Sequence, residues 1–202
     1  ASRFALEGLE LRSLWEKGPF QFTSEEIGRI RKGAMGAGLR IPCVASPFFK
    51  CDYDDIPTGK AHMEGLKRCC DTAHLLGAGL IRGFSFWKKP GLALPQIAAR
   101  FGPVAELLEK EGLTLVLEPD PAVSASNGRE LGRLLALIGS PRVMALWDPG
   151  NIIFDREGEQ PYPEGYEAVK PFLCHVHLKD ARRKGGQPEA VLLGDGEVDL
   201  EG

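Results

Sequence analysis

Three apolar segments of this sequence end in a side chain that can bind a metal ion or transfer a proton. Glu118 follows Leu-Thr-Leu-Val-Leu, Asp148 follows Val-Met-Ala-Leu-Trp, and His177 lies two residues after His175. Alternate residues of an extended strand share a face, so the two histidines point the same way. A charge at the end of an apolar strand is costly to bury unless it is paired or metal-bound. Two carboxylates and an imidazole suit a divalent ion such as Mn²⁺, Mg²⁺, Co²⁺ or Zn²⁺.

Each of these residues also has an ordinary structural interpretation. A glutamate at a strand end is commonly a solvated rim charge. Asp148 precedes Pro149-Gly150, where an aspartate often caps its own turn. One of the two histidines is expected to be a hydrogen-bonded core residue. The occurrence of all three groups at successive strand ends is what favours a metal site.

The elements that must position these residues alternate between strand-like and helix-like patterns. Parallel neighbours need a crossover connection, so this alternation predicts a parallel sheet. The predicted strands are residues 6–14, 40–46, 80–87, 113–118, 143–148 and 172–179. The predicted helices are residues 23–38, 61–76, 97–111, 127–138 and 162–169, and residues 191–202 are expected to form an irregular tail. Thr23 and Glu26 have the spacing of a capping box at the start of the first helix.

Two architectures fit this pattern, an open doubly wound sheet and a closed barrel. The open sheet favours a glycine-rich phosphate turn after an early strand, but Gly33, Gly36 and Gly38 fall at the end of a helix. The barrel places polar residues at the carboxyl ends of several strands, and Glu10 and Arg12 add to those already named. We therefore predict an α/β fold of the (β/α)₈ TIM barrel type.

The predicted barrel is a single domain over residues 1–202 that is short of strands. A complete barrel has eight strands over roughly 250 residues, whereas about six are recognisable here. We therefore expect the chain to lack the first and last strands, so that the barrel is incomplete at both termini or is closed by another chain.

The composition excludes several classes of protein. Hydrophobic residues make up 43% and charged residues 26% of the 202 positions, as in ordinary globular domains. The net charge of -3 gives no general attraction to nucleic-acid phosphates, and no apolar stretch reaches the roughly 20 residues of a membrane helix. Five cysteines without metal-finger spacing predict free thiols in the reducing cytoplasm, with Cys174 as a buried packing residue.

Four short motifs resemble those of the xylose isomerase-like superfamily, which contains sugar phosphate isomerases and epimerases and the family 2 AP endonucleases. They are the Leu-Glu pair at 117–118, Trp-Asp-Pro-Gly-Asn at 147–151, His-Val-His-Leu-Lys-Asp at 175–180 and Leu-Gly-Asp-Gly-Glu-Val-Asp at 193–199. The histidine motif is the most specific of the four, and the resemblance extends from the Leu-Glu-Leu-Arg strand at 9–12 to the end of the chain.

The resemblance implies a (β/α)₈ barrel with one divalent metal ion (Mn, Mg, Co or Zn) held by Glu, Asp, His and Glu. Glu118, Asp148 and His177 match the first three ligands, and the fourth has no counterpart because the sequence stops at Gly202. Glu118 is implied to be one of two catalytic acid/base residues. The implied reaction moves a proton next to a carbonyl through a metal-stabilised enediolate.

The resemblance also suggests residues that bind a small-molecule sugar, sugar phosphate or polyol. Arg183 falls where epimerases of this superfamily have a substrate-binding arginine. The other candidates for the pocket are Glu10, Arg12, Trp87, Asn151 and His175. A homo-oligomer is left open, and neither a membrane nor nucleic acid is an expected partner.

Asn151 departs from the pattern, because many members carry a histidine at this position. An amide can hydrogen-bond a sugar hydroxyl but is a poor zinc ligand. This weakens the prediction of an abasic-site endonuclease similar to endonuclease IV. The leading prediction is a sugar isomerase or epimerase. The alternatives are a keto-polyol dehydratase that uses the same metal and base, the abasic-site endonuclease, and a degenerate barrel without catalytic activity.

Overall fold

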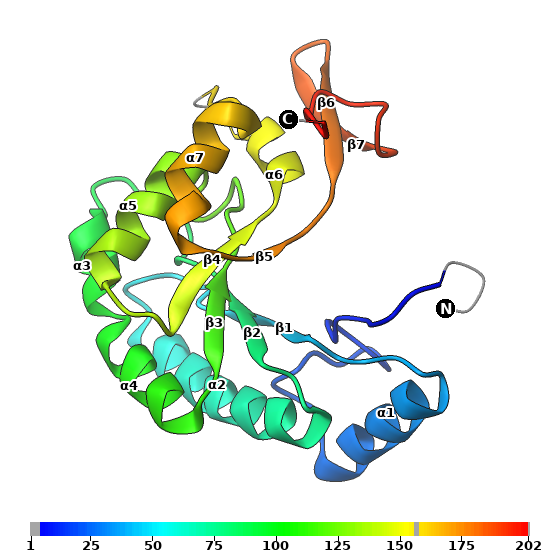
Figure 1. Cartoon of the computed structure of the whole chain (residues 1–202). Helices are drawn as coiled ribbons and strands as arrows, with labels where there is room; N and C mark the ends of the chain where they lie inside the picture. The colour runs from blue at the N-terminus through cyan, green and yellow to red at the C-terminus, as the bar shows by residue number, and fades with distance from the viewer. Residues whose placement is uncertain (1–4, 156–157, 202) are drawn as a thin grey trace.

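The computed structural model describes residues 5–155 and 158–201, and its centre is a parallel sheet of five strands (Figure 1). The strands are β1 (Cys43–Phe48), β2 (Leu80–Gly83), β3 (Thr114–Leu117), β4 (Val143–Trp147) and β5 (Leu173–Val176). Neighbours along the chain are neighbours in the sheet, in the order β1-β2-β3-β4-β5. This order has no reversal of the kind that defines a doubly wound sheet.

Helices cover the outer side of the curved sheet (Figure 1). They are α1 (Ser24–Gly36), α2 (Ile56–Leu76), α3 (Leu94–Ala99), α4 (Gly102–Glu111), α5 (Gly128–Ile138), α6 (Pro149–Ile153) and α7 (Tyr166–Val169). A π-helical turn (Pro161–Gly165) precedes α7, and a 3₁₀ turn (Lys170–Phe172) leads into β5. One-sided coverage and a consecutive strand order confirm the predicted TIM-barrel type of fold. Within the described residues, no helix has both the length and the apolar character to cross a membrane.

The two faces of the sheet contribute to two separate apolar clusters. Outward-facing residues such as Val44, Ile81 and Leu115 are buried against the helices in the main core. Cys43, Val116 and Leu146 form a small cluster on the inner face. Because strand residues alternate between faces, the positions two residues beyond Val116 and Leu146 also turn inward. Those positions carry the carboxylates of the candidate site.

The predicted first strand is present only in part. Residues 6–14 make two isolated parallel bridges with the neighbourhood of β1, Gly8 with Arg40 and Leu11 with Val44. The pairing is interrupted, although Leu11 N donates to Cys43 O at 3.1 Å and Leu11 O accepts from Ala45 N at 2.9 Å. The segment therefore runs beside β1 in the barrel direction, as predicted, without forming a continuous strand.

Two predicted helices have different bounds in the structure. α2 begins at Ile56 rather than at residue 61, because the Asp55 side chain accepts a hydrogen bond from Thr58 N at 2.9 Å and caps the helix there. The single helix predicted over 97–111 is two helices, α3 and α4. Pro103 lacks a backbone N–H and lies in the first turn of α4, so the chain starts a new helix at this point.

The sequence prediction missed a hairpin near the C-terminal end. Its antiparallel strands are β6 (Asp180–Lys184) and β7 (Gln187–Val191), joined by Gly185 and Gly186 with positive φ angles of 59° and 79°. Two glycines between short extended segments are a signal for such a turn. The five cysteines are free, as predicted, but the expectation of a buried Cys174 was wrong. Its side chain is exposed because β5 is the edge strand of the described sheet.

The buried Asp180 carboxylate connects the hairpin to the tail. It accepts hydrogen bonds from the backbone N–H groups of Ala181 (2.8 Å), Gly194 (2.9 Å), Gly196 (2.9 Å) and Val198 (3.2 Å). A Cβ atom on Gly196 would overlap the Asp180 carboxylate, so this close approach requires glycine.

Candidate metal centre

The backbone ladder places the candidate ligands at one end of the sheet. Glu118 N donates to Gly83 O at 3.0 Å, and His177 N donates to Trp147 O at 2.9 Å, so the strand pairing of β3 and β5 continues past the assigned strand ends. Asp148 directly follows β4. All three side chains therefore reach the inner face at the carboxyl ends of the strands, where barrels of this type have their active sites.

The three predicted ligands converge on one point. His177 Nδ1 lies 3.4 Å from Glu118 Oε1 and 4.0 Å from Asp148 Oδ2. One ligand atom from each residue lies within 4.8 Å of those from the other two. Two ligands of a tetrahedral zinc ion, each about 2.1 Å from the metal, are about 3.4 Å apart. The spacing in this cluster is therefore that of ligands around a single small cation.

Asp148 combines the two roles that its sequence context suggested. Its Oδ1 accepts a hydrogen bond from Asn151 N at 2.9 Å and caps the short helix α6, while Oδ2 is the atom directed at His177. Burial raises the pKa of Asp148 to about 6; Glu118 adds to the rise, and the Asn151 N–H and Lys179 oppose it. Capping thus orients the carboxylate and leaves one of its oxygens, Oδ2, available to bind a metal ion.

Glu118 is held as a carboxylate by its neighbours. Burial favours a raised pKa, but the hydrogen bond to His177 and the positive charge of Arg82 outweigh it and lower the pKa of Glu118. Asn151 Nδ2 donates to Oε1 at 3.2 Å, and Arg82 Nη1 lies 3.1 Å from Oε2. Among the described residues, none donates a geometrically acceptable hydrogen bond to the buried Oε2. This oxygen therefore has Arg82 as an ionic neighbour but keeps lone pairs that could bind a metal ion.

The carboxylates around His177 give the cluster an excess of negative charge. Hydrogen bonds with Glu10 and Glu118 raise the pKa of His177 to about 9. The imidazole is then cationic at neutral pH and partly balances the surrounding carboxylates. A divalent ion bound by His177 Nδ1, Glu118 and Asp148 would balance them more fully, and the mixed oxygen and nitrogen donors suit such an ion. The residues present therefore fit a divalent metal.

A cavity of about 830 Å³ opens over the three ligands. Glu10, Arg12 and Asn151, which the sequence analysis placed in the substrate pocket, are part of its lining. Trp87 and His175 were also predicted for the pocket, but neither lines this cavity in the described part of the chain. The Trp87 ring lies 5.5 Å from Lys50 Nζ, and His175 Nε2 is hydrogen-bonded to Glu10 Oε1.

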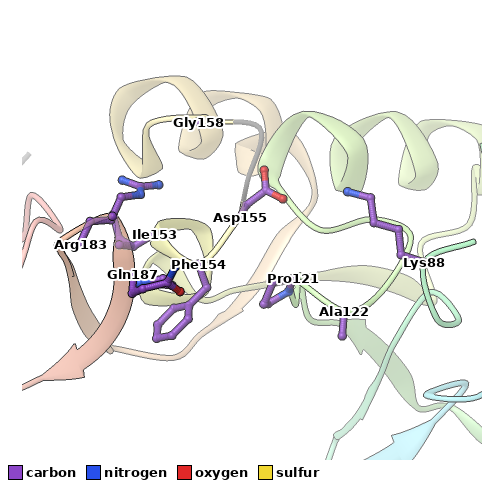
Figure 2. A pocket seen from close by; sticks show the side chains of 11 residues that line it. Lys88, Pro121, Ala122, Ile153, Phe154, Asp155, Gly158, Arg183 and Gln187 are labelled. Carbon is purple, nitrogen blue, oxygen red and sulfur yellow. The ribbon is translucent and has the colours of Figure 1, made fainter.

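Arg183 lies in a different cavity. This second cavity, of about 820 Å³, is lined on one side by Arg183 and Gln187 from the hairpin and on the other by Lys88 and Asp155 (Figure 2). Phe154 also lines it, and its ring lies 4.9 Å from Lys179 Nζ of the first cavity. Substrate binding stays a prediction for all six candidates: Glu10, Arg12, Trp87, Asn151, His175 and Arg183.

Three cationic residues of the first cavity were not predicted from the sequence, Lys50, Arg82 and Lys179. Lys179 Nζ donates to Asn151 Oδ1 at 2.5 Å, and Lys50 Nζ pairs with Asp120 at 2.7 Å. The alternation of strand residues contained a signal for two of them. Lys179 lies two residues after His177, and Arg82 is a lone charge within the apolar strand β2.

The family model described as "Xylose isomerase-like TIM barrel" matches the chain over residues 1–202. The chain belongs to the xylose isomerase-like TIM barrel family. No curated protein sequence matches this xylose isomerase-like barrel.

Several solved structures have the same fold. A xylose isomerase-like TIM barrel protein from Mycobacterium smegmatis in complex with magnesium has a TM-score of 0.78 at 16% identity, over 98% of this chain and 71% of that one. D-allulose 3-epimerase from Methylomonas sp. in complex with D-allulose has a TM-score of 0.74 at 19% identity, over 98% and 68%. A probable 3-DHS dehydratase from Bacillus anthracis, involved in petrobactin synthesis, has a TM-score of 0.64 at 17% identity, over 79% and 57%. Identities this low support the fold and leave the activity to be argued from the site.

Proposed function

We propose that this xylose isomerase-like barrel is a divalent-metal-dependent isomerase or epimerase of a sugar, sugar phosphate or polyol. The observation that carries the proposal is the convergence of Glu118, Asp148 and His177 beneath an open cavity. The magnesium and D-allulose bound to two proteins of the same fold support this assignment. The cavity of about 830 Å³ is within the usual range for a small-molecule site.

The proposed chemistry divides between the ion and the side chains. A bound divalent ion supplies a Lewis acid for the oxygen that gains negative charge when a proton next to a carbonyl leaves. Glu118 accepts that proton, since its lowered pKa keeps it ionised at neutral pH. Asn151 and Lys179, which bond to each other beside Glu118, present polar groups that can orient substrate hydroxyls.

Elemental analysis of the purified protein tests the metal centre first. We expect about one equivalent of Mn, Co, Zn or Mg, with a Mn²⁺ titration alongside because Mg²⁺ is easily lost on purification. Asp148→Ala and His177→Ala should both abolish binding, because each removes a ligand. His74→Ala and Asp54→Ala are the matched controls, since both residues are exposed and lie outside the cavity. A parent protein without metal, and without a change in thermal stability on adding Mn²⁺, would contradict the proposal.

A panel of ketoses, ketose phosphates and keto-polyols then tests the reaction. Incubation in deuterated water should introduce deuterium next to the carbonyl of the true substrate, because proton abstraction precedes reprotonation from solvent. Glu118→Gln should abolish this exchange while the fold is retained. Metal binding without exchange on any member of the panel would contradict the isomerase or epimerase activity but not the metal site.

A keto-polyol dehydratase is the second candidate. It is supported by the similarity to the probable 3-DHS dehydratase and by the cations Arg12, Lys50 and Lys179 around the cavity, which suit an acidic substrate. The same proton abstraction would then be followed by loss of a hydroxyl group. Mass spectrometry of the products distinguishes the two reactions, because only the dehydratase product has lost one water.

A further inference from the structure

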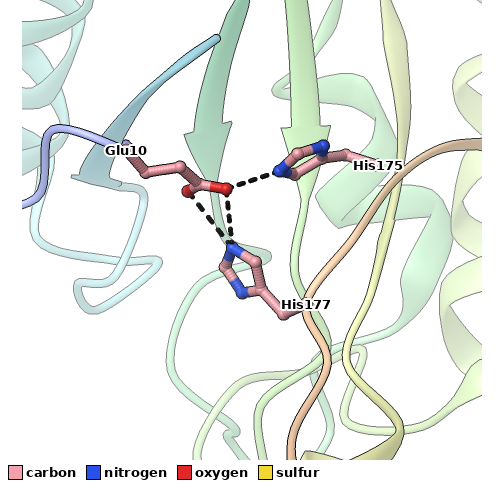
Figure 3. A group of neighbouring side chains, drawn as sticks. All are labelled: Glu10, His175 and His177. Carbon is pink, nitrogen blue, oxygen red and sulfur yellow. Dashed lines mark hydrogen bonds and ion pairs between the residues drawn. The ribbon is translucent and has the colours of Figure 1, made fainter. Parts of the chain in front are cut away.

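Glu10, on the N-terminal segment, is hydrogen-bonded to His175 and His177, which lie at the opposite edge of the sheet (Figure 3). It lies on the segment beside β1, whereas His175 belongs to β5 and His177 follows it. Glu10 Oε1 is 2.5 Å from His175 Nε2. Both carboxylate oxygens of Glu10 are 3.2 Å from His177 Nε2. One carboxylate therefore lies within hydrogen-bond distance of both imidazoles.

The contacts of Glu10 indicate which nitrogen of each histidine carries a proton. A carboxylate within hydrogen-bond distance of two imidazole nitrogens accepts from both of them, so each imidazole presents an N–H at Nε2. In a neutral His177, the lone pair is then on Nδ1. That nitrogen is the one directed at Glu118 and Asp148.

We propose that Glu10 is a positioning residue of the metal centre. Its carboxylate accepts a hydrogen bond from the Nε2 N–H of His177, and it thereby fixes the tautomer and ring orientation in which Nδ1 would bind the ion. The inference rests on the proposed metal-dependent function. Carboxylates commonly hold metal-bound histidines in this way, through the nitrogen that does not bind the metal. Here the carboxylate comes from the opposite end of the chain, 167 residues before His177.

His175 has a different part in this arrangement. Its short hydrogen bond to Oε1 holds the Glu10 carboxylate in place, and its ring meets that of His177 edge-on, with centroids 5.7 Å apart and planes at 77°. Both Glu10 oxygens also lie 3.2 Å from His177 Nε2, a contact that does not pass through His175. We therefore expect His175 to contribute less to metal affinity than Glu10 does.

The same three side chains suggest a competing arrangement, in which Glu10, His175 and His177 hold a second ion. Their ligand atoms lie within 4.8 Å of one another. Ligands of a tetrahedral zinc ion are about 3.4 Å apart, however, given metal distances of about 2.1 Å. The 2.5 Å separation of Glu10 Oε1 and His175 Nε2 is much shorter than that and is short even for a hydrogen bond to a carboxylate, so these two atoms are too close to share a metal ion. The observed spacing therefore favours shared protons over a shared metal.

Calorimetric Zn²⁺ titration of the full chain tests the proposal with four variants. Glu10→Gln keeps the size of the side chain but removes its charge and directs an amide donor at the imidazoles. We expect it to bind Zn²⁺ about 10- to 100-fold more weakly than the parent. Glu10→Asp keeps the charge and should recover part of the affinity, and His175→Gln should retain most of it. Glu25→Gln on the exposed surface of α1 is the matched control and should bind as the parent does.

A spectroscopic measurement separates positioning from a general loss of structure. In nitrogen-15 spectra of the Zn²⁺-loaded parent, His177 should show a metal-bound Nδ1 and a slowly exchanging proton on Nε2. Glu10→Gln should lose this protected proton, while thermal melting reports whether the variant is folded. If Glu10→Gln is unfolded, the comparison rests on Glu10→Asp, which should show a weakened but still protected Nε2 proton.

The outcomes that overturn the inference differ from those that overturn the proposed function. Parental Zn²⁺ affinity and an unchanged Nε2 signal in Glu10→Gln would refute the positioning role alone. Two equivalents of Zn²⁺ in the parent, with the second lost in His175→Gln, would replace it with a second metal site. A parent protein that binds no metal would refute the proposed function and this inference with it.

Discussion

Replacing Asp180 by asparagine should loosen the C-terminal hairpin and its tail. The carboxylate is 1% exposed and accepts four backbone N–H groups, from Ala181, Gly194, Gly196 and Val198. An amide of the same shape offers one acceptor oxygen, and its NH₂ group faces donors that it cannot satisfy. The substitution therefore removes half of the acceptor capacity at the point where the tail is attached.

The size of the effect depends on which N–H groups water can reach. Oδ1 accepts from the buried Ala181 and Val198, so we expect the amide oxygen of the asparagine at the Oδ1 position. The NH₂ group then faces the donors of the exposed Gly194 and the half-buried Gly196. Water can replace the bond of Gly194, whereas the N–H of Gly196 loses its partner at a cost of about 1–3 kcal/mol. At about 1.4 kcal/mol per factor of ten, a loss of about 2 kcal/mol makes local opening roughly 30-fold more frequent.

Native-state hydrogen exchange measures this opening directly. The amides of Gly196 and Val198 in the tail should exchange roughly 30-fold faster in Asp180→Asn, while amides of the central strands keep their protection. Asp195→Asn, an exposed aspartate in the same tail, is the control and should leave exchange unchanged. Unaltered protection of both Gly196 and Val198 in Asp180→Asn would refute this reasoning.

Acid should act on the same contact. Burial favours a raised pKa for Asp180, but the four backbone hydrogen bonds outweigh it and lower the pKa. The stabilisation is therefore complete above the unfolded-state value of about 3.9 and is lost as the pH falls through the lowered folded-state pKa. Hydrogen exchange of the tail should show this loss only at strongly acidic pH.

Three further predictions concern the stability of the whole domain. Gly128→Ala should cost about 1–3 kcal/mol in urea unfolding, because its Cβ would overlap Gly165 O, whereas Gly33→Ala meets open space and should not destabilise. Arg82→Met should cost the metal-free protein about 1–3 kcal/mol at neutral pH, since the buried Glu118 carboxylate loses one of its two cationic partners and keeps only His177. Unfolding at parental urea concentrations would contradict this. Mn²⁺ at about 100 times its dissociation constant should stabilise the parent by about 2.7 kcal/mol, and a chelator should reverse the shift in calorimetry.

The convergence of the three candidate metal ligands could be predicted from the sequence because two simple rules apply to them. Parallel strands end at one edge of the sheet, and alternate residues share a face, so Glu118, Asp148 and His177 had to approach one another. Arg82 could not be assigned in the same way. Its partner belongs to the neighbouring strand, and the pairing depends on a register, Arg82 beside Val116, that no local pattern specifies.

The elements were predictable where local chemistry determines them. The capping box of Thr23 and Glu26 is present at the start of α1, with both reciprocal hydrogen bonds. The hairpin was missed because Asp-Ala-Arg-Arg-Lys has none of the apolar alternation of a strand. It is held instead by the contacts of Asp180 with a tail that lies 14 to 18 residues further along the chain.

The bond between Glu10 and His175 also constrains the order in which the molecule folds. It joins residues 165 positions apart, so the loop that it closes contains most of the chain. The entropy of closing a loop opposes contacts of this separation until the intervening elements have formed. The candidate metal centre is thus expected to be completed late, once the intervening strands have assembled. A metal-sensitive signal during refolding would therefore report the final closure of the domain, not its initial collapse.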